Sequence, residues 1–451
     1  MTGLPPGLLI AAPASGSGKT TVTLALLRQL RNQGVAVSSV KAGPDYIDPG
    51  FHLAASGRPC LNLDTWAMRP QTLAAALARA GATAELILGE GVMGLFDGAA
   101  VADDRGLAAG STAQLAALTG WPVVLVVDCQ GMGGSVAALV AGFAGHHPAV
   151  KLAGVILNKV ASPRHEALLR GACEAAGFEV FGALRRDAAL ARPSRHLGLV
   201  QAQEDAALDA FLETAAGAVA AQLDVAALRA AAGPLRLSAA PAGAPPPPPI
   251  PPLGQHIAVA ADLAFAFAYP LLLEGWRDAG ADISFFSPLA DAAPDGAATA
   301  VYLPGGYPEL HAGRLAANRT FLEGLRGAAA RGAVVYGECG GYMVLGQGLE
   351  DAAGRRHAMA GLLPLESSFK APQRHLGYRR AELVSAGPLG AAGASYRGHE
   401  FHYARVLGAE GPAAAALFQT SAADGGPAWL AGQRRGSVLG SFVHLIDGEG
   451  G

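Results

Sequence analysis

A glycine-rich turn near the amino terminus has the composition of a phosphate-binding loop. It follows the apolar run 7–12, precedes a helix-forming stretch from Lys19 to about Gln33, and reads Ala-Pro-Ala-Ser-Gly-Ser-Gly-Lys-Thr-Thr over residues 12–21. Glycines let backbone N–H groups turn toward phosphate, a lysine reaches the terminal phosphates, and a threonine hydroxyl can bind Mg²⁺. The sequence therefore predicts an ATP site formed by Ser15, Gly16, Ser17, Gly18, Lys19, Thr20 and Thr21, with Thr20 also on the metal.

Two polar segments that follow later apolar runs supply candidate metal ligands. The stiff segment 41–52 contains Asp45, and a further segment starts at Glu90. Ligands of an open parallel sheet bind at the carboxyl ends of its strands, and Mg²⁺ prefers oxygen ligands. We therefore expect Asp45 and Glu90 to join Thr20 around Mg²⁺. Asp128, at the end of another apolar run, is an alternative carboxylate.

The same segments contain candidates for holding the substrate. Asp45, Tyr46 and Asp97 are expected to position it during phosphoryl transfer. Asn158 ends a further apolar run, where its amide could read a nucleotide base. A solvated turn, or a carboxylate with a purely structural role, is the non-catalytic alternative for these segments.

A second candidate site centres on Cys339, which stands in Gly-Glu-Cys-Gly-Gly directly after an apolar run. A nucleophile at a strand-to-helix turn needs small neighbours, and a helix N-terminus favours a thiolate. Gly306, in a Pro-Gly-Gly segment, and Gly340 could present two N–H groups to an oxyanion. His444 closes a late strand and is the candidate base.

Other histidines compete for the role of base. His375 lies earlier in the chain, and His399 and His402 belong to the segment 397–403, which alternates as a strand does. This alternation places His399 on one face and both Glu400 and His402 on the other. A metal site and a polar, substrate-facing strand both fit this cluster, and its role stays open. The remaining cysteines lack a glycine-rich context and are expected to be structural: Cys60, Cys129 and Cys173.

The elements that must position these residues alternate between strand and helix patterns. Continuous apolar runs separated by helical or glycine-rich stretches predict a doubly wound, mostly parallel α/β sheet in the first half. These runs cover residues 7–12, 35–41, 85–89, 123–128 and 152–158. The second half repeats the style and then becomes richer in β structure from Gly361 to Phe442, which predicts a second α/β domain. Its runs cover 256–260, 282–286, 300–303 and 333–336.

A proline-rich stretch separates the two halves. Residues 235–253 include Pro-Pro-Pro-Pro-Pro-Ile-Pro-Pro, which can neither continue a helix nor pair as a central strand. A chain of 451 residues with 51% hydrophobic residues can form two full-sized cores. We therefore expect domains at 1–234 and 254–451, joined by a linker at 235–253.

The net charge and the hydropathy of the sequence argue against nucleic acid and membranes as partners. A formal net charge of −3 argues against nucleic acid as the main partner. No apolar run approaches the roughly 18 residues of a membrane span, and the short apolar stretch at the amino terminus has no preceding Lys or Arg. The four scattered cysteines fit a reducing cytoplasm. We expect a cytoplasmic protein that binds small molecules, with homodimer formation left open.

Taken together, these segments resemble a known family. The Cys339 turn with its Pro-Gly-Gly partner resembles class I glutamine amidotransferase domains, and the first half resembles dethiobiotin synthetase-like ATP-binding domains. Their fusion resembles the cobyrinic acid and hydrogenobyrinic acid a,c-diamide synthases of cobalamin biosynthesis. The matching segments are spread over nearly the whole chain outside the linker: 12–21, 41–48, 90–98, 193–198, 303–309, 337–341 and 397–403.

The resemblance implies a carbon–nitrogen ligase that amidates the a and c carboxylates of a corrin, with ATP, Mg²⁺ and L-glutamine. Cobyric acid synthases and Ni-sirohydrochlorin a,c-diamide synthases are the alternatives within the wider group. A P-loop switch ATPase with a binding module is the non-enzyme alternative. Whether the corrin carries cobalt stays open.

The resemblance also includes one departure from the general amidotransferase pattern. Most class I enzymes place a glutamate two residues beyond the catalytic histidine, but Ile446 stands there in this chain. Asp447 lies one residue further and, if the strand continues, points to the other face. We therefore expect a dyad of Cys339 and His444.

Overall fold

The computed structural model describes residues 4–190, 194–195, 198–237, 248–407 and 416–449. Contacts divide the chain into two compact units, Met1–Trp66 with Leu73–Ala244 and Ala67–Thr72 with Pro245–Gly451. The division falls inside the predicted linker, of which residues 238–247 lie outside the described part. The short segment 67–72 groups with the second unit, which the sequence did not predict.

The first unit is built on a seven-stranded sheet whose strands all run parallel, as predicted. The strand order is β3-β2-β4-β1-β5-β6-β7, so the chain reverses its direction of travel around β1. Ligands of such sheets bind where the strand order reverses, and the glycine-rich loop follows β1 there. The strands are β1 Gly7–Ala11, β2 Val37–Ala42, β3 Leu61–Leu63, β4 Leu86–Glu90, β5 Val123–Asp128, β6 Leu152–Val160 and β7 Val180–Arg185.

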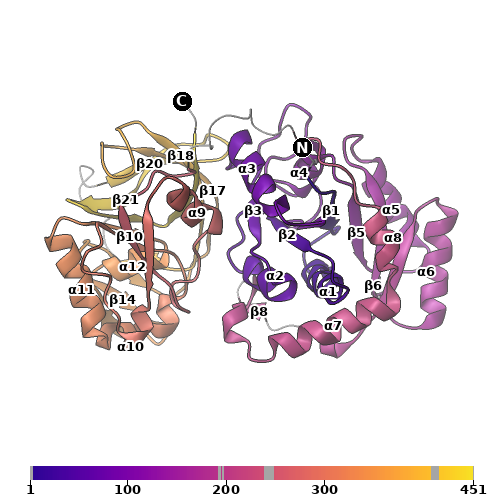
Figure 1. Ribbon diagram of the computed structural model, residues 1–451, viewed down its shortest axis with the longest axis horizontal. Coiled ribbons are helices and arrows are strands. Elements are labelled where there is room, and N and C mark those ends of the chain that lie inside the picture. The colour runs from indigo at the N-terminus through magenta and orange to yellow at the C-terminus, as the bar shows by residue number, and fades with distance from the viewer. Residues whose placement is uncertain (1–3, 191–193, 196–197, 238–247, 408–415, 450–451) are drawn as a thin grey trace. The chain divides into compact units, whose positions relative to one another are not determined.

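Helices cover this sheet, and one hydrophobic core joins α1 and α7 to its central strands. Leu8 and Ile10 of β1 pack in that core with Leu27 of α1 and Leu212 of α7. In Figure 1, α1, α2 and α7 lie along the same side of the unit. The helices are α1 Lys19–Asn32, α2 Asp48–Ser56, α3 Pro70–Gly81, α4 Thr112–Thr119, α5 Ser135–Gly145, α6 Pro163–Ala175, α7 Leu208–Gln222 and α8 Val225–Ala230. Shorter elements are the 3-10 turns Ala188–Leu190 and Ala202–Glu204 and the strand pair β8 Ser194–Arg195 and β9 Gly198–Leu199.

The second unit contains a ten-stranded mixed sheet in the order β11-β10-β12-β13-β22-β21-β20-β17-β18-β23. The first five strands pair in parallel and the others pair antiparallel, in agreement with the predicted increase in β structure after residue 361. The strands are β10 His256–Ala260, β11 Asp282–Phe286, β12 Ala300–Leu303, β13 Val334–Glu338, β17 His375–Leu383, β18 Ser395–His402, β20 Ala416–Ala422, β21 Trp429–Arg435, β22 Val438–Ser441 and β23 Val443–Gly448.

Helices and a small sheet complete the second unit. Trp276 of α9 and Phe321 of α11 are fully buried. The helices are α9 Pro270–Asp278, α10 Ala312–Ala317, α11 Arg319–Ala330 and α12 Gly340–Leu345, with 3-10 turns at Pro288–Ala290 and Pro308–His311. A four-stranded sheet contains β14 Gly348–Glu350, β15 Arg356–Ala358, β16 Glu366–Ser368 and β19 Arg405–Val406.

The segment 67–72 is attached to the second unit through one buried carboxylate. Arg69 donates to Asp447 from its backbone N–H at 2.8 Å and from its guanidinium at 2.6 Å and 2.9 Å. The same guanidinium donates to the carbonyl of Pro248 at 3.3 Å. The carboxylate of Asp447 therefore forms a hydrogen-bonded ion pair with an arginine that lies almost 380 residues earlier in the sequence.

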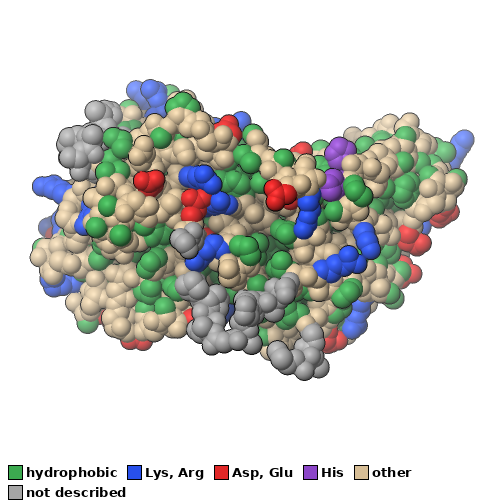
Figure 2. Space-filling model, turned by 90° about the horizontal axis from the view of Figure 1, so that it is seen from above, with side chains coloured by type: hydrophobic (Ala, Val, Ile, Leu, Met, Phe, Trp, Pro, Cys, Tyr) green, Lys and Arg blue, Asp and Glu red, His purple; other side chains and the backbone are tan. Residues whose placement is uncertain are grey.

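The outer surface mixes charged and apolar side chains. On the face in Figure 2, basic and acidic side chains are interspersed with apolar ones. Among the described residues, the search for a helix long and apolar enough to cross a membrane found none.

Candidate active sites

The glycine-rich loop connects β1 to α1 and is held by side chains from β6. The amide Nδ2 of Asn158 donates to the carbonyl of Ser17 at 2.8 Å, and Nζ of Lys159 donates to the carbonyl of Gly16 at 2.9 Å. Gly18 has φ 92°, and a Cβ there would lie 2.2 Å from Nδ2 of Asn158. Only glycine satisfies both the conformation and the close approach.

These contacts give Asn158 a structural role beside its expected one. Its buried amide supports the backbone of the loop, and contact with a nucleotide base stays a prediction. Asp128 is likewise engaged, because its carboxylate pairs with Lys159 at 2.6 Å. Strand β6 thus supplies two adjacent residues, Asn158 and Lys159, that hold the loop through its backbone carbonyls.

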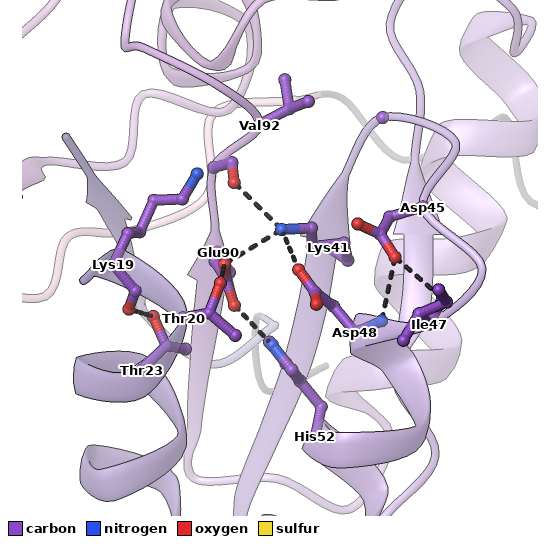
Figure 3. Close-up of polar contacts among 12 residues, drawn as sticks. Lys19, Thr20, Thr23, Lys41, Asp45, Ile47, Asp48, His52, Glu90 and Val92 are labelled. Atoms are coloured by element: carbon purple, nitrogen blue, oxygen red, sulfur yellow. Dashed lines mark hydrogen bonds and ion pairs between the residues drawn. The ribbon is translucent and has the colours of Figure 1, made fainter. Parts of the chain in front are cut away.

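Glu90, at the end of β4, is the centre of a buried charge cluster (Figure 3). Its Oε1 accepts from the hydroxyl of Thr20 at 2.5 Å and from Nζ of Lys41 at 3.0 Å, and its Oε2 lies 2.7 Å from Nε2 of His52. Lys41 also pairs with Asp48 at 2.7 Å. Strands β2 and β4 pair in parallel with Lys41 opposite Glu90, which places these two side chains next to each other.

The cluster sets the ionisation of its members. Burial would lower the pKa of Lys41, but the carboxylates of Asp48 and Glu90 outweigh it and hold that pKa well above its usual value. Burial would raise the pKa of Glu90, but Lys41 and His52 hold it well below its usual range. Burial and the nearby Lys41 lower the pKa of Lys19 to about 8. The charge on Lys19 therefore depends on its burial and on the neighbouring Lys41.

The remaining expected residues of this unit lie around the same strand ends. Oδ1 of Asp45 accepts from the backbone N–H groups of Ile47 and Asp48 at 2.8 Å and 2.9 Å, where α2 begins. Tyr46 is half-buried in that loop. Asn62 of β3 donates to the carbonyls of Gly43 and Asp45, which fixes the loop to the sheet.

The segment that contains Asp97 lies against the start of the glycine-rich loop. Leu95 N–H donates to the carbonyl of Ala12 at 2.8 Å, and Nζ of Lys19 donates to the carbonyl of Met93 at 3.2 Å. Asp97 is exposed, and its Oδ2 accepts from the N–H of Gly94 at 2.8 Å. The structure thus brings Asp97 to the neighbourhood of the loop without burying it.

Cys339 occupies a strained turn between β13 and α12. Its φ of 47° and ψ of −103° lie outside the regions that a non-glycine residue normally adopts, at a cost of about 1–3 kcal/mol. Gly341 permits the turn, because a Cβ there would lie 2.0 Å from the carbonyl of Leu303. The backbone N–H of Cys339 donates to the carbonyl of Ser441 at 2.8 Å, which anchors the turn to β22.

The proposed base and oxyanion groups converge on this turn. A Cβ on Gly305 would lie 2.3 Å from Cε1 of His444, 3.1 Å from its Nε2 and 3.4 Å from Cβ of Cys339, so the glycine borders both side chains. A Cβ on Gly340 would lie 3.0 Å from the backbone nitrogen of Gly306. The two expected oxyanion donors are therefore neighbours beside Cys339.

Both partners of the pair are buried and favour their neutral forms. Burial raises the pKa of the Cys339 thiol well above its usual range. Burial, with the nearby His399 and His402, lowers the pKa of His444 to about 3. The resting pair is thus a thiol and an imidazole, and the thiolate must form as the proton moves to the histidine.

Sequence reasoning missed two residues that carry charge in these sites. Lys41 was noticed only as part of a polar loop, although lysine is rare in this chain and its position at a strand end was a usable signal. Glu338, next to Cys339, lies 3.8 Å from Nδ1 of His444 through its Oε2. Its role depends on strand pairing that the sequence does not display.

The cluster of His375, Glu400 and His402 forms a hydrogen-bonded and stacked group. The ligand atoms lie within 4.8 Å of one another. However, the two imidazole rings stack face to face at 4.6 Å, and Arg379 donates to Glu400 at 2.7 Å. Imidazoles on one small metal ion approach it through their edges, and an adjacent guanidinium opposes a second cation. The geometry therefore favours the polar strand over the metal site.

A phosphate-type loop on a parallel α/β sheet, combined with a cysteine turn on a second α/β unit, defines a two-unit glutamine amidotransferase with a nucleotide-binding part. Residues 8–200 match the family model for the CobQ/CobB/MinD/ParA nucleotide binding domain. Residues 256–450 match that for the CobB/CobQ-like glutamine amidotransferase domain.

Curated relatives match nearly the whole chain. It is 55% identical to a hydrogenobyrinate a,c-diamide synthase from Sinorhizobium sp, over 98% of this chain and 99% of that protein. It is 54% identical to the synthase of the same name from Rhodobacter capsulatus, with the same coverage. The chain belongs to the family of hydrogenobyrinate a,c-diamide synthases.

Proposed function

We propose that this protein catalyses the ATP-dependent, glutamine-hydrolysing amidation of the a and c carboxylates of hydrogenobyrinate in cobalamin biosynthesis. The observation that carries the proposal is the presence in one chain of both a glycine-rich ATP loop and a cysteine–histidine pair. Its relatives, which match over nearly the whole chain, carry a name that states the same product. Cobyrinate remains the alternative substrate, and a homodimer stays an expectation.

The second unit would release ammonia from glutamine. The thiol of Cys339 transfers its proton to Nε2 of His444, and the sulfur attacks the side-chain amide carbon. The N–H groups of Gly306 and Gly340 are suited to hold the oxyanion. As the tetrahedral adduct collapses, the imidazolium returns the proton to the leaving nitrogen, and ammonia departs. Water then cleaves the thioester and releases glutamate.

The first unit would activate the carboxylate. Lys19 and the backbone N–H groups of residues 15–19 bind the phosphates of ATP, and the γ-phosphoryl group passes to the substrate carboxylate. Ammonia then attacks the acyl phosphate and phosphate leaves. Asp97, exposed beside the loop, with Asp45 and Tyr46, is proposed to position the substrate.

The oxygen donors near the loop fit Mg²⁺. The Thr20 hydroxyl donates its proton to Glu90, so its lone pairs are available for a cation. Both oxygens of Glu90 accept hydrogen bonds, from Thr20, Lys41 and His52, so direct ligation by Glu90 stays a prediction. We propose that Thr20 holds the ion and that Glu90 orients Thr20, while Asp45 stays a candidate ligand. When bound, Mg²⁺ supplies neutralisation of phosphate charge.

Product analysis tests this function. The full chain is offered hydrogenobyrinate and, in separate reactions, cobyrinate and Ni-sirohydrochlorin, with ATP, Mg²⁺ and glutamine. Products are identified by mass spectrometry, and release of phosphate and glutamate is measured in parallel. We expect a diamide from hydrogenobyrinate that requires both ATP and glutamine. ATP hydrolysis without glutaminase activity would instead support a P-loop switch with a binding module. Amidation of other side chains would support a cobyric acid synthase-like activity, and amidation of Ni-sirohydrochlorin would support that synthase.

A further inference from the structure

The glutaminase pair has a buried carboxylate beside it that no expected role uses. Glu338 is the residue before Cys339 and is the last residue of β13. Its side chain is 1% exposed, and its Oε2 lies 3.8 Å from Nδ1 of His444. Because Ile446 occupies the usual position of the orienting glutamate, this is a carboxylate that reaches the histidine from a different strand.

Three donors fix the orientation of that carboxylate. Oε1 accepts from the hydroxyl of Tyr336 at 2.8 Å and from the backbone N–H of Leu445 at 3.1 Å. Oε2 accepts from the hydroxyl of Tyr302 at 2.8 Å. Since Leu445 follows His444 directly, one of these bonds ties the carboxylate to the strand of the proposed base. Such a buried, fully oriented carboxylate is expensive to maintain and suited to holding a neighbour in place.

We propose that Glu338 is the positioning residue of His444 and completes, from the strand of the nucleophile, a Cys–His–Glu arrangement. This inference rests on the proposed function, because it concerns the glutaminase half-reaction. Glu338 touches no reacting atom, and it acts through the imidazole. In this proposal Glu338 is added to the predicted pair of Cys339 and His444 as a positioning residue.

The mechanism of this positioning is the choice of tautomer. A carboxylate facing Nδ1 favours the form with the proton on Nδ1, which leaves the lone pair on Nε2. Nε2 lies beside Gly305, and that glycine also borders Cβ of Cys339. The 3.8 Å separation is longer than a hydrogen bond, and catalytic bonds often shorten when substrate binds.

The same geometry gives a distinctive pH dependence. Burial raises the pKa of Glu338 to about 7, against the opposing effect of Tyr302, Tyr336 and the Leu445 N–H. Above that pH the ionised carboxylate holds the proton on Nδ1. Below it, a neutral carboxyl group can donate to Nδ1 and select the wrong tautomer, so glutaminase activity is lost as the pH falls through about 7.

Other titratable groups also face the pair, and the Glu338→Gln variant separates their effect on the acid limb from that of Glu338. His444 itself has a pKa lowered to about 3, mainly by burial, and stays neutral throughout. The groups on β18 that act on it are His399, His402 and Glu400. Burial would raise the pKa of Glu400, but its hydrogen bond with His402 and the nearby Arg379 lower it to about 2. The two tyrosines that contact Glu338 have pKa values raised well above their usual value by burial.

The test is Glu338→Gln in the full chain, assayed for glutaminase activity from pH 5.5 to 9 and for amidation with free ammonia. We expect kcat for glutamine hydrolysis to fall on the order of a hundredfold, the scale of a misoriented general base, with KM for glutamine little changed. The acid limb near pH 7 disappears, and ammonia-dependent amidation is retained. Alkylation of Cys339 by chloroacetamide slows in parallel.

Tyr336→Phe is the matched second variant, and it decides the question if Glu338→Gln does not fold. It removes one hydrogen bond that stabilises the ionised carboxylate, so the pKa of Glu338 rises and the acid limb moves to higher pH. Retention of the wild-type limb in either variant overturns the proposal. So does a loss of kcat in Glu338→Gln smaller than about threefold, or one matched by ammonia-dependent activity. A wild-type chain without glutaminase activity would refute the proposed function instead.

Discussion

Replacement of Lys41 by methionine should destabilise the first unit more than any other single lysine substitution. The change keeps most of the apolar stem and removes the ammonium. That ammonium lies 3.0 Å from Glu90 and 2.7 Å from Asp48, and its side chain is 4% exposed. The variant therefore leaves two buried carboxylates without their shared cation.

The magnitude follows from those distances. At an effective dielectric constant of about 20, each contact is worth about 5–6 kcal/mol of Coulomb energy. Desolvation of the charges offsets much of that gain, and removal of one partner from a buried pair costs about 3–5 kcal/mol. Asp48 and Glu90 can recover part of the loss by taking up a proton, so we expect about 3 kcal/mol.

Hydrogen exchange of the intact chain, followed by mass spectrometry, gives the local readout. Amides of β2 and β4 should exchange about 150-fold faster in Lys41→Met, which is 3 kcal/mol at roughly 1.4 kcal/mol per factor of ten. Lys151→Met is the matched control, since Lys151 is exposed in the same unit. The double variant Lys41→Met with Glu90→Gln should recover part of the protection. Exchange of β2 and β4 in Lys41→Met within twofold of the control would refute the reasoning.

Three further predictions address the chemistry. Cys339→Ser should abolish glutamine-dependent amidation and leave ammonia-dependent amidation, measured as diamide by mass; loss of both would contradict the division of labour between the units. Asp97→Asn should fold normally, because an amide oxygen can still accept from Gly94, and keep glutaminase activity while diamide formation falls on the order of a hundredfold; a wild-type diamide yield would remove Asp97 from the site. Gly305→Ala should eliminate glutaminase activity but not ammonia-dependent amidation, because its methyl group would lie 2.3 Å from Cε1 of His444; unchanged glutamine hydrolysis would show that the imidazole can move aside.

The parts of the fold that sequence reasoning reached are those that local patterns determine. Continuous apolar runs predicted the central strands of the first sheet, because both faces of a parallel sheet are buried. Gly18 and the glycines around Cys339 marked the two turns, because left-handed or crowded backbone tolerates little else. These features depend on residues close together in the chain, so one sequence is enough to find them.

The parts that sequence reasoning missed depend on strand register. Lys41 and Glu90 are 49 residues apart, and the parallel pairing of β2 with β4 makes them neighbours. Glu338 and His444 are 106 residues apart in sequence numbering and meet only through folding of the second sheet. Arg69 pairs with Asp447 because the segment 67–72 groups with the second unit. Contacts between residues so far apart in the sequence produce no local pattern from which they could be predicted.

The two candidate sites differ in their electrostatics: the first contains a cluster of charged side chains, and the reacting pair of the second is neutral. Phosphoryl transfer concentrates negative charge, so Lys19, Lys41 and His52 surround Glu90 in a cluster whose balance is fixed before ATP binds. Glutamine hydrolysis is proposed to begin from the neutral pair Cys339 and His444, because burial disfavours a charge on either side chain. Separate units allow both environments in one chain. Ionic strength should therefore alter the KM for ATP far more than the KM for glutamine.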